Sequence, residues 1–150
     1  MLYLLMDAGP DTYAVASASV VGVVPCAALK SVPSAPPAVA GILNFRGCPV
    51  PVIDCGQLLG GVPCRIRFST RIILHRVAIA GRDRTLGLMA ENVTRVQPFE
   101  EEDFVEPGAR GPGFPPAGRV AALGSRWVQR LHPESILSED LWETLTAEEA

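Results

Sequence analysis

Hydrophobic residues occur along the chain in short runs separated by Gly, Pro and polar residues. The first run, Leu2–Met6, is followed by a Gly-Pro-Asp turn at residues 9–11 and a second run, Thr12–Ala16, which predicts a β-hairpin. A β-branched cluster at residues 20–24, ended by Pro25, predicts a third strand. This spacing indicates β-structure rather than helix.

The longest predicted strand is Thr70–Ala80, which is apolar on nearly both faces. A strand with two apolar faces is expected to be central and well covered. Residues 81–83 predict a hairpin turn, and Arg84–Ala90 predicts the return strand with one apolar face at period two. A kink is expected at Glu91-Asn92, after which the apolar pattern continues.

The segment between these strands is rich in proline. Residues 31–37 contain three prolines and are predicted to be irregular, because proline lacks a backbone donor and restricts the residue before it. Residues 41–47 form a short run closed by a turn glycine, Gly47. Prolines 49 and 51 confine the next strand, residues 49–54, to a sheet edge or to the start of a strand. Residues 56–64 predict at most a short helical turn and a loop.

The C-terminal third predicts one more hairpin and a helix. Residues 107–118 hold eight Gly or Pro in twelve positions and predict a loop. Residues 119–124 and 126–131 predict a hairpin around Gly124-Ser125, and residues 133–146 predict a helix that starts at a proline. Many short strands with turns between them indicate an all-β domain with a short C-terminal helix.

Composition and charge narrow the class of protein. A chain of 150 residues predicts one domain, and 48% hydrophobic residues exclude disorder for most of it. The net charge of -3 argues against a nucleic-acid partner, although residues 65–99 carry seven Arg against two acids and residues 100–150 carry four Arg against eleven acids. The uncharged residues 12–29 are too polar and too broken by Gly and Pro to span a membrane, so no membrane insertion is expected.

No catalytic constellation stands out. His75 lies in an apolar run and His132 precedes a predicted helix, so both are interpreted as structural residues. Asp54 follows a strand, where it could be a general base or could cap the next turn. No phosphate-binding loop or nucleophile elbow occurs. The pattern predicts a binding module rather than an enzyme.

The four cysteines are at positions 26, 48, 55 and 64, with none closer to the next than seven residues. Structural zinc sites usually take their ligands from close pairs, so neither a metal nor another cofactor is expected. No basic residue precedes the apolar start of the chain and Asp7 ends it, so we expect no secretory signal. The cysteines are then expected to be reduced thiols of a cytoplasmic protein.

Residues 32–54, VPSAPPAVAGILNFRGCPVPVID, carry the most specific motif. They resemble the signature of the CheW family, adaptor domains of bacterial chemosensory arrays, in which V-P-x-x-P leads into G-x-x-N-x-R-G and then P-V-x-D. The matching positions are Val32, Pro33, Pro36, Gly41, Asn44, Arg46, Gly47, Pro51, Val52 and Asp54. The resemblance extends in outline over residues 1–137. It departs at Gly22, where family members commonly carry an acid that can pair with the motif's arginine.

This resemblance implies two intertwined five-stranded SH3-like barrels in a single CheW-like domain, residues 1–150. We expect the first barrel mainly in residues 12–64, the second mainly in residues 65–132, and the helix over 133–146. The implied function is a non-catalytic adaptor that couples chemoreceptors to a CheA-type histidine kinase. Its implied partners are the kinase regulatory domain, the cytoplasmic tip of a chemoreceptor and other CheW-like domains.

The contacts are expected at apolar barrel edges and around Arg46, whose alternative role is a structural one, satisfying nearby carbonyls or a carboxylate. The candidate partner-binding residues are Val20, Val23, Asn44, Arg46, Gly47, Pro51, Val52 and Asp54. Three alternatives stay open. They are a CheW-like regulator of an auxiliary chemosensory pathway (pili or a second messenger), a small-ligand sensor without kinase coupling, and a thiol or metal protein that uses the cysteines.

Overall fold

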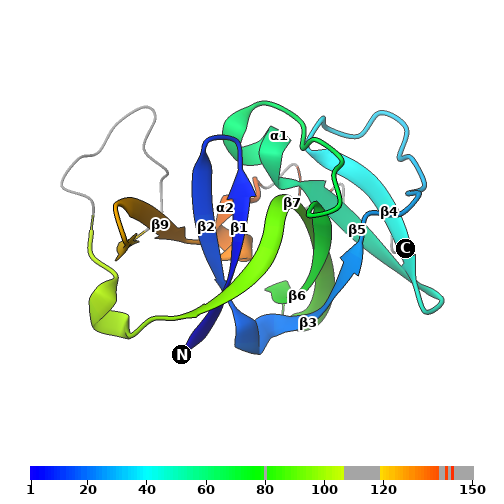
Figure 1. Ribbon diagram of the computed structural model, residues 1–150. Coiled ribbons are helices and arrows are strands. Elements are labelled where there is room, and N and C mark those ends of the chain that lie inside the picture. The colour runs from blue at the N-terminus through cyan, green and yellow to red at the C-terminus, as the bar shows by residue number, and fades with distance from the viewer. Residues whose placement is uncertain (80, 107–118, 139–140, 142, 144–150) are drawn as a thin grey trace.

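The computed structural model describes residues 1–79, 81–106, 119–138, 141 and 143. Nine strands dominate the described chain, with two α-helices and two 3-10 helices, all of them short. The predicted all-β class is confirmed (Figure 1). All nine strands belong to one continuous hydrogen-bonded system, whose main order is β3-β6-β7-β1-β2-β9-β8, with β5 pairing β7 and β4 pairing β5.

Five strands form the first half of this system, here called lobe A. They are β1 (Leu2–Ala8), β2 (Asp11–Ala16), β8 (Val120–Leu123), β9 (Arg126–Arg130) and the second half of β7 (Arg82–Pro98). The predicted hairpin turns hold: β1 pairs β2 across Gly9, which has a φ of 61°, and β8 pairs β9 across Gly124, which has a φ of 62°. Gly adopts this left-handed conformation without steric cost.

The other five strand segments form lobe B. They are β3 (Val20–Pro25), β4 (Val39–Phe45), β5 (Cys48–Asp54), β6 (Arg71–Ile79) and the first half of β7. Strand β6 lies between β3 and β7, so the prediction that it is central is confirmed. The 3-10 helix η1 (Ser17–Ser19) leads into β3, and helix α1 (Cys55–Gly60) follows β5.

Strand β7 belongs to both lobes. Residues 82–90 pair with β6, and residues 91–98 pair with β1. The register shifts at the predicted kink, where Asn92 adopts a φ of 51°. The Asn92 amide donates to the Asp7 carboxylate at 2.7 Å, which ties the bulge to β1. A bulge bends a strand and increases its twist, which lets one strand leave the first sheet and enter the second.

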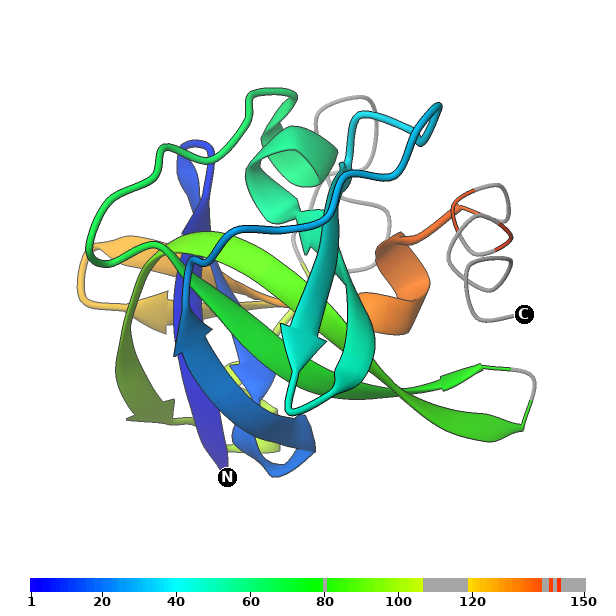
Figure 2. The same cartoon turned by 90° about the vertical axis from the view of Figure 1, so that its right-hand side faces the viewer.

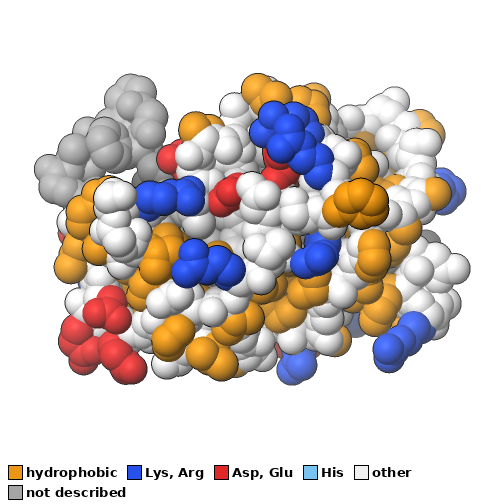
Figure 3. Space-filling model, in the orientation of Figure 1, with side chains coloured by type: hydrophobic (Ala, Val, Ile, Leu, Met, Phe, Trp, Pro, Cys, Tyr) orange, Lys and Arg blue, Asp and Glu red, His pale blue; other side chains and the backbone are white. Residues whose placement is uncertain are grey.

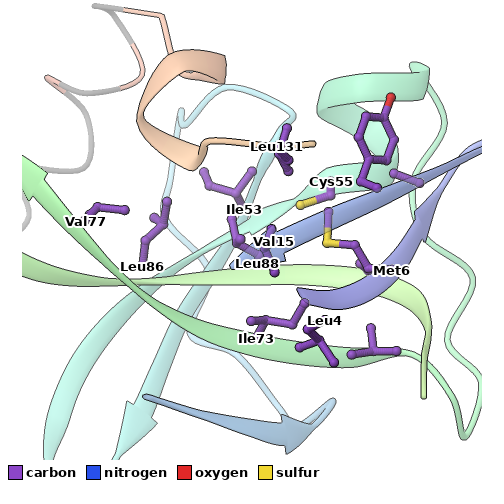
Figure 4. Packing of buried hydrophobic residues seen from close by; sticks show 14 of the residues in the cluster. Leu4, Met6, Val15, Ile53, Cys55, Ile73, Val77, Leu86, Leu88 and Leu131 are labelled. Carbon is purple, nitrogen blue, oxygen red and sulfur yellow. The ribbon is translucent and has the colours of Figure 1, made fainter. Parts of the chain in front are cut away.

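The hydrophobic core has three clusters. One lies inside lobe A around Tyr3 and Phe104, one lies inside lobe B around Val52 and Leu74, and the largest lies between the lobes. Figure 4 shows this shared cluster; its labelled members are Leu4, Met6, Val15, Ile53, Cys55, Ile73, Val77, Leu86, Leu88 and Leu131. Alternate residues of one strand therefore enter different clusters, which explains runs that are apolar on both faces.

The lobes do not follow the division expected along the chain. Residues 12–64 were expected to form mainly one barrel and residues 65–132 the other, but β6 and the first half of β7 pair with β3 and β5 in lobe B. Lobe A, in turn, combines β1 and β2 with β8 and β9. The strands β6 and β7 are adjacent in the sequence and form a local hairpin. The strands that pair beside them come from distant segments, which are brought together by packing on the shared core.

The sequence also predicts a C-terminal helix and a long loop before the last hairpin. Helix α2 covers Pro133–Ile136 and is interrupted at Leu137, which is extended and enters the shared core; Leu141 and Glu143 are helical again, and the rest of the helix predicted over residues 133–146 lies outside the described residues. The loop predicted at residues 107–118 lies outside the described residues. No helix within the described ranges is both long enough and apolar enough to cross a membrane.

The prolines of β5 lie where the sequence suggested. Pro49 and Pro51 pair with β4 only, and the parallel pairing of β5 with β7 begins at Val52, opposite Gly87. Pro49 and Pro51, which lack a backbone N–H, therefore lie in the part of β5 that has only β4 as a neighbour.

Substitution of Gly87 tests the tight packing between β5 and β6. A Cβ at position 87 would lie 2.8 Å from Val52 Cγ2 and 3.0 Å from Ile72 Cγ2, whereas a Cβ at Gly22, on the edge strand, meets only Leu74 Cδ1 at 3.8 Å. We expect Gly87→Ala to lower the free energy of unfolding by about 1–3 kcal/mol in urea titrations. The matched control Gly22→Ala should leave it unchanged or slightly raised. Equal effects of the two substitutions would contradict this packing.

Candidate partner-binding surface

The tip of the β4–β5 hairpin presents three of the predicted contact residues to solvent. Phe45 pairs with Cys48, which leaves Arg46 and Gly47 as a two-residue turn with φ values of 51° and 83°. Two positive φ values are characteristic of the type I′ hairpin turn. The Gly47 N–H donates to Asn44 Oδ1 at 2.8 Å, so the asparagine side chain stabilises the turn. Asn44, Arg46 and Gly47 are all exposed.

Arg46 contacts an aromatic ring but has no charged partner among the described residues. Its guanidinium lies 5.0 Å from the centre of the Phe45 ring, and no carboxylate pairs with it within the described chain. Position 22, where related proteins commonly carry an acid that can pair with this arginine, is a glycine here. The alternative role of Arg46, satisfying nearby carbonyls or a carboxylate, therefore finds no support among the described residues. A positive φ is also costly for a residue other than Gly, Asn or Asp.

Strand β3 is one of the two edge strands of lobe B, and β4 is the other. Strand β3 pairs with β6 on one side and ends the strand order on the other. The predicted contact residue Val23 is 39% exposed, but Val20 is half-buried and packs against the shared core. Its neighbour Val21, 48% exposed, is the outward residue that the sequence reasoning missed. Residues 20–24 read Val-Val-Gly-Val-Val, and because both sets of alternate positions are apolar, the sequence does not reveal which set faces outward.

The edge strand and the hairpin tip lie on the same lobe. Val24 of β3 and Phe45 of the hairpin both pack against the inner cluster of lobe B. In Figure 1 the hairpin tip lies at the lower right, whereas β3 begins at the bottom centre, so the two are separate parts of one lobe. We call these exposed groups the hairpin–edge surface, which consists of Val21, Val23, Asn44, Arg46 and Gly47.

The other predicted site residues do not belong to this surface. Pro51 is half-buried, Val52 is completely buried in the cluster of lobe B, and Asp54 is 7% exposed. Val52 and Asp54 are therefore not exposed for direct contact with a partner in this structure. These motif positions build the lobe that carries the hairpin.

Asp54 is the cap of helix α1 and the anchor of the loop after it. One carboxylate oxygen accepts from the Gln57 N–H at 3.1 Å, and the Cys64 N–H lies 3.1 and 3.2 Å from the two oxygens. Satisfying the first free N–H groups of a helix stabilises it by about 1 kcal/mol. Of the two roles that the sequence left open for Asp54, the structure supports the cap.

The cysteines occupy unlike environments. Cys55 and Cys64 are buried, Cys26 is half-buried, and Cys48 is exposed beside the hairpin tip. Burial raises the pKa of the Cys64 thiol to about 12, with the hydrogen bond to Asp54 as the next cause, and burial also raises the pKa of Cys55. Both thiols are therefore protonated at neutral pH. The described residues contain no group of three or more His, Cys, Asp or Glu that could hold a metal ion.

His75 is a buried histidine of β6. It is 4% exposed and lies opposite Val20 and Leu86, and its Nδ1 has no hydrogen-bond partner among the described residues. Burial lowers its pKa, partly offset by a backbone hydrogen bond at Arg76 and by the charge of Glu134. The neutral imidazole is therefore a core residue, as the sequence suggested.

Charge is unevenly distributed over the surface. Figure 3 shows acidic side chains gathered at the lower left, over η2 (Glu101–Asp103), while Lys and Arg are spread over the rest of that face. Within the acidic group, Arg130 donates to Glu101 at 2.8 Å, and this hydrogen bond lowers the pKa of Glu101. The hairpin–edge surface instead combines valine side chains with one cation, an arrangement suited to binding.

The chain is similar to known proteins both in sequence and in fold. The sequence matches the family model described as a CheW-like domain over residues 2–141. The fold is similar to the crystal structure of the scaffolding protein TtCheW from Thermoanaerobacter tengcongensis, with a TM-score of 0.75, 22% identity, and coverage of 93% of this chain and 89% of that chain. No curated protein sequence matches the chain.

Replacement of Arg46 separates a structural role from a binding role. Asn accepts a positive φ in a type I′ turn more readily than Arg, so Arg46→Asn should raise the free energy of unfolding by up to about 1 kcal/mol in urea titrations. Asp54→Asn, which weakens a buried cap, should lower it by about 1–2 kcal/mol. A large loss of stability in Arg46→Asn would show that the arginine supports the fold.

His75 predicts a pH dependence of stability. Because its pKa is lowered in the folded protein, the unfolded chain binds the proton more readily, so stability is full above the usual value of 6.5 and falls as the pH drops below it. We expect the urea midpoint to fall between pH 7 and pH 5.5, by at most about 1.4 kcal/mol per pH unit for one proton. His75→Leu should remove most of this slope. If His75→Leu leaves the pH dependence of stability unchanged, other titrating groups must cause that dependence.

Proposed function

The chain belongs to the family of CheW-like domains, and from this premise we propose that it couples chemoreceptors to a CheA-type histidine kinase. Proteins of this family are non-catalytic scaffolds, and membership supports the role of a chemotaxis adaptor in signal transduction. The finer proposal is that the kinase regulatory domain binds at the hairpin–edge surface. The proposed partners place the protein in the cytoplasm.

The observations that carry this proposal are the edge strand β3 and the exposed hairpin tip of the same lobe. An edge strand presents unpaired backbone N–H and C=O groups, which a strand of another domain can extend by main-chain hydrogen bonds. Val21 and Val23 lie on the outward face of this edge, and their side chains supply apolar contact. The resulting contact needs no groove and no chemical step.

Arg46 adds selectivity to this contact. Its guanidinium has no competing carboxylate among the described residues, so it is free to pair with an acid of the partner. A planar guanidinium binds a carboxylate through two parallel hydrogen bonds. The strained φ of Arg46 is consistent with retention for binding rather than for stability.

On this proposal, coupling is achieved by geometry. The adaptor holds the kinase regulatory domain at one surface and the receptor at another, so a movement of the receptor tip is passed on through a rigid core. The three packed clusters supply that rigidity, because packed interiors transmit displacement with little compression. Other CheW-like domains would bind the same edge if they present a complementary strand.

Calorimetric titration with the regulatory domain of a CheA-type kinase from the same organism tests the proposal. We expect micromolar binding, about -8 kcal/mol. Arg46→Asn and the double variant Val21→Thr/Val23→Thr should each weaken it by about tenfold or more. The control Trp127→Ser changes an exposed aromatic residue of lobe A, 60% exposed, and should bind as the wild type does.

Two results would contradict this assignment. If the folded wild-type protein does not bind the regulatory domain, the kinase-coupling proposal fails. If binding is normal but Arg46→Asn and the valine variant bind equally well, the domain is an adaptor with a different kinase surface. Thermal melts of each variant exclude loss of fold as the cause.

A further inference from the structure

The bulge of β7 at Asn92 is held by side chains from both lobes. From lobe B, the loop of residues 61–69 places the Ser69 hydroxyl 3.2 Å from Asn92 Oδ1, and the Ser69 carbonyl accepts from the Val93 N–H at 2.9 Å. From lobe A, the Asp7 carboxylate accepts from the Asn92 amide at 2.7 Å. Figure 2 shows β7 crossing the molecule from the β6–β7 hairpin and bending as it enters lobe A. At this bend the lobes are joined by side chains as well as by the strand itself.

The hydrogen bonds continue from Asp7 to the last hairpin of lobe A. The Thr12 hydroxyl donates to the other Asp7 oxygen at 2.8 Å and accepts from the guanidinium of Arg126 at 2.6 Å. Thr12 is only 8% exposed, and Arg126 is the first residue of β9. Five side chains therefore form an unbroken series between the two lobes. We call this series the interlobe network; it consists of Arg126, Thr12, Asp7, Asn92 and Ser69.

The direction of each hydrogen bond in this network depends on Asp7. A carboxylate can only accept, so both of its neighbours must donate. The Thr12 hydroxyl therefore gives its proton to Asp7 and a lone pair to Arg126, while the amide nitrogen of Asn92 faces Asp7. This leaves Asn92 Oδ1 as the acceptor for the Ser69 hydroxyl. Because successive hydrogen bonds polarise one another, weakening one of them weakens its neighbours.

Asn92 links the two sides of the network through its side chain. Its φ of 51° lies in the left-handed region, which Asn tolerates better than most residues but at a cost. A glycine would adopt this conformation more easily, yet it has no side chain for either hydrogen bond. The backbone geometry of the bulge therefore accounts for only part of what Asn92 does, and the two side-chain bonds supply the rest.

The loop of residues 61–69 depends on polar contacts for its order. Cys64 is its only buried residue, and its large apolar side chains are exposed. Beyond Cys64 the loop is held by hydrogen bonds, from the Thr70 hydroxyl to the Arg65 carbonyl at 2.6 Å and from Ser69 to the bulge. Segments with few buried apolar contacts open locally at low free-energy cost. The order of this loop is therefore sensitive to its bonds with the bulge.

We infer that the interlobe network couples the order of the loop of residues 61–69, in lobe B, to the last hairpin of lobe A. When both donors are bound to Asp7, the Asn92 side chain is oriented to hold Ser69, and the loop stays closed on the bulge. A carboxylate that draws Arg126 out of the network would loosen the loop in the other lobe. This coupling lies outside the hairpin–edge surface and needs no partner, so it is independent of the proposed function.

Amide hydrogen exchange followed by NMR tests the coupling. Asn92→Asp keeps the size of the side chain and its tolerance of a positive φ, but it places a second carboxylate against Asp7. The amides of Thr70 and Val93, which bond within the loop and between the loop and the bulge, should exchange about tenfold faster or more. The control Gly87→Ala strains the packing between β5 and β6 whether the loop is closed or open, so both rates should stay within about twofold of the wild type.

Exchanging the two side chains should restore the network. In the double variant Asp7→Asn/Asn92→Asp the asparagine amide donates to the aspartate, so the pair is kept with its direction reversed. Both exchange rates should then return to within about twofold of the wild type. At the far end, Arg126→Leu removes the bond to Thr12 and should raise the same two rates about threefold. Its neighbour Trp127 is 60% exposed and outside the network, so Trp127→Ser should leave them unchanged.

Four results would overturn the inference. The two loop amides could exchange in Asn92→Asp as they do in the wild type, which would show that the network does not hold the loop. The double variant could exchange as fast as Asn92→Asp, so that the pair with Asp7 is not the cause. Gly87→Ala could accelerate the same amides equally, which would mean that they exchange only by global unfolding. Arg126→Leu could leave both rates unchanged, which would separate the loop from the last hairpin.

Discussion

One strand, β7, pairs with both sheets of this domain, and the other elements are arranged around that constraint. Its first half is hydrogen-bonded to β6 and its second half to β1, so the two lobes are covalently continuous across the bulge at Asn92. Strands on either side of such a crossing face their own lobe with one set of side chains and the neighbouring lobe with the other. The large cluster between the lobes is the result.

This arrangement packs many of the apolar side chains into three clusters and leaves binding to edges and loops. Of the four buried polar side chains among the described residues, two serve the backbone: Asp54 caps α1 and holds the Cys64 N–H, and Thr70 donates to the Arg65 carbonyl in the loop of residues 61–69. Burial also keeps the Cys55 and Cys64 thiols protonated. The exposed apolar groups include Val21 and Val23 on β3 and Ile66 and Phe68 in the loop of residues 61–69, and such groups favour contacts with other proteins.

The candidate site could be predicted only in part. The motif around Arg46 identified the hairpin tip correctly as an exposed turn, because Gly47 and Asn44 act within a few residues of it. The same motif could not distinguish contact residues from core residues, so Val52 and Asp54 were assigned to the surface although they build the interior. On β3, burial alternates strictly along the strand, so Val20 and Val23 face opposite sides and Val21 shares the outward side with Val23. The exposure of Phe68 had no signal in the hydrophobic pattern, which favours burial of such a residue.

The sequence by itself determined the strands, their hairpin turns, the irregular proline segment and the central position of β6, because these depend on backbone preferences and on contacts between near neighbours. Only the tertiary structure decided which hairpin joins which lobe, where helix α2 is interrupted and which apolar residues stay outside. Those outcomes depend on filling one core shared by distant segments, and pairs such as β2 with β9 are brought together by that packing rather than by their own sequences.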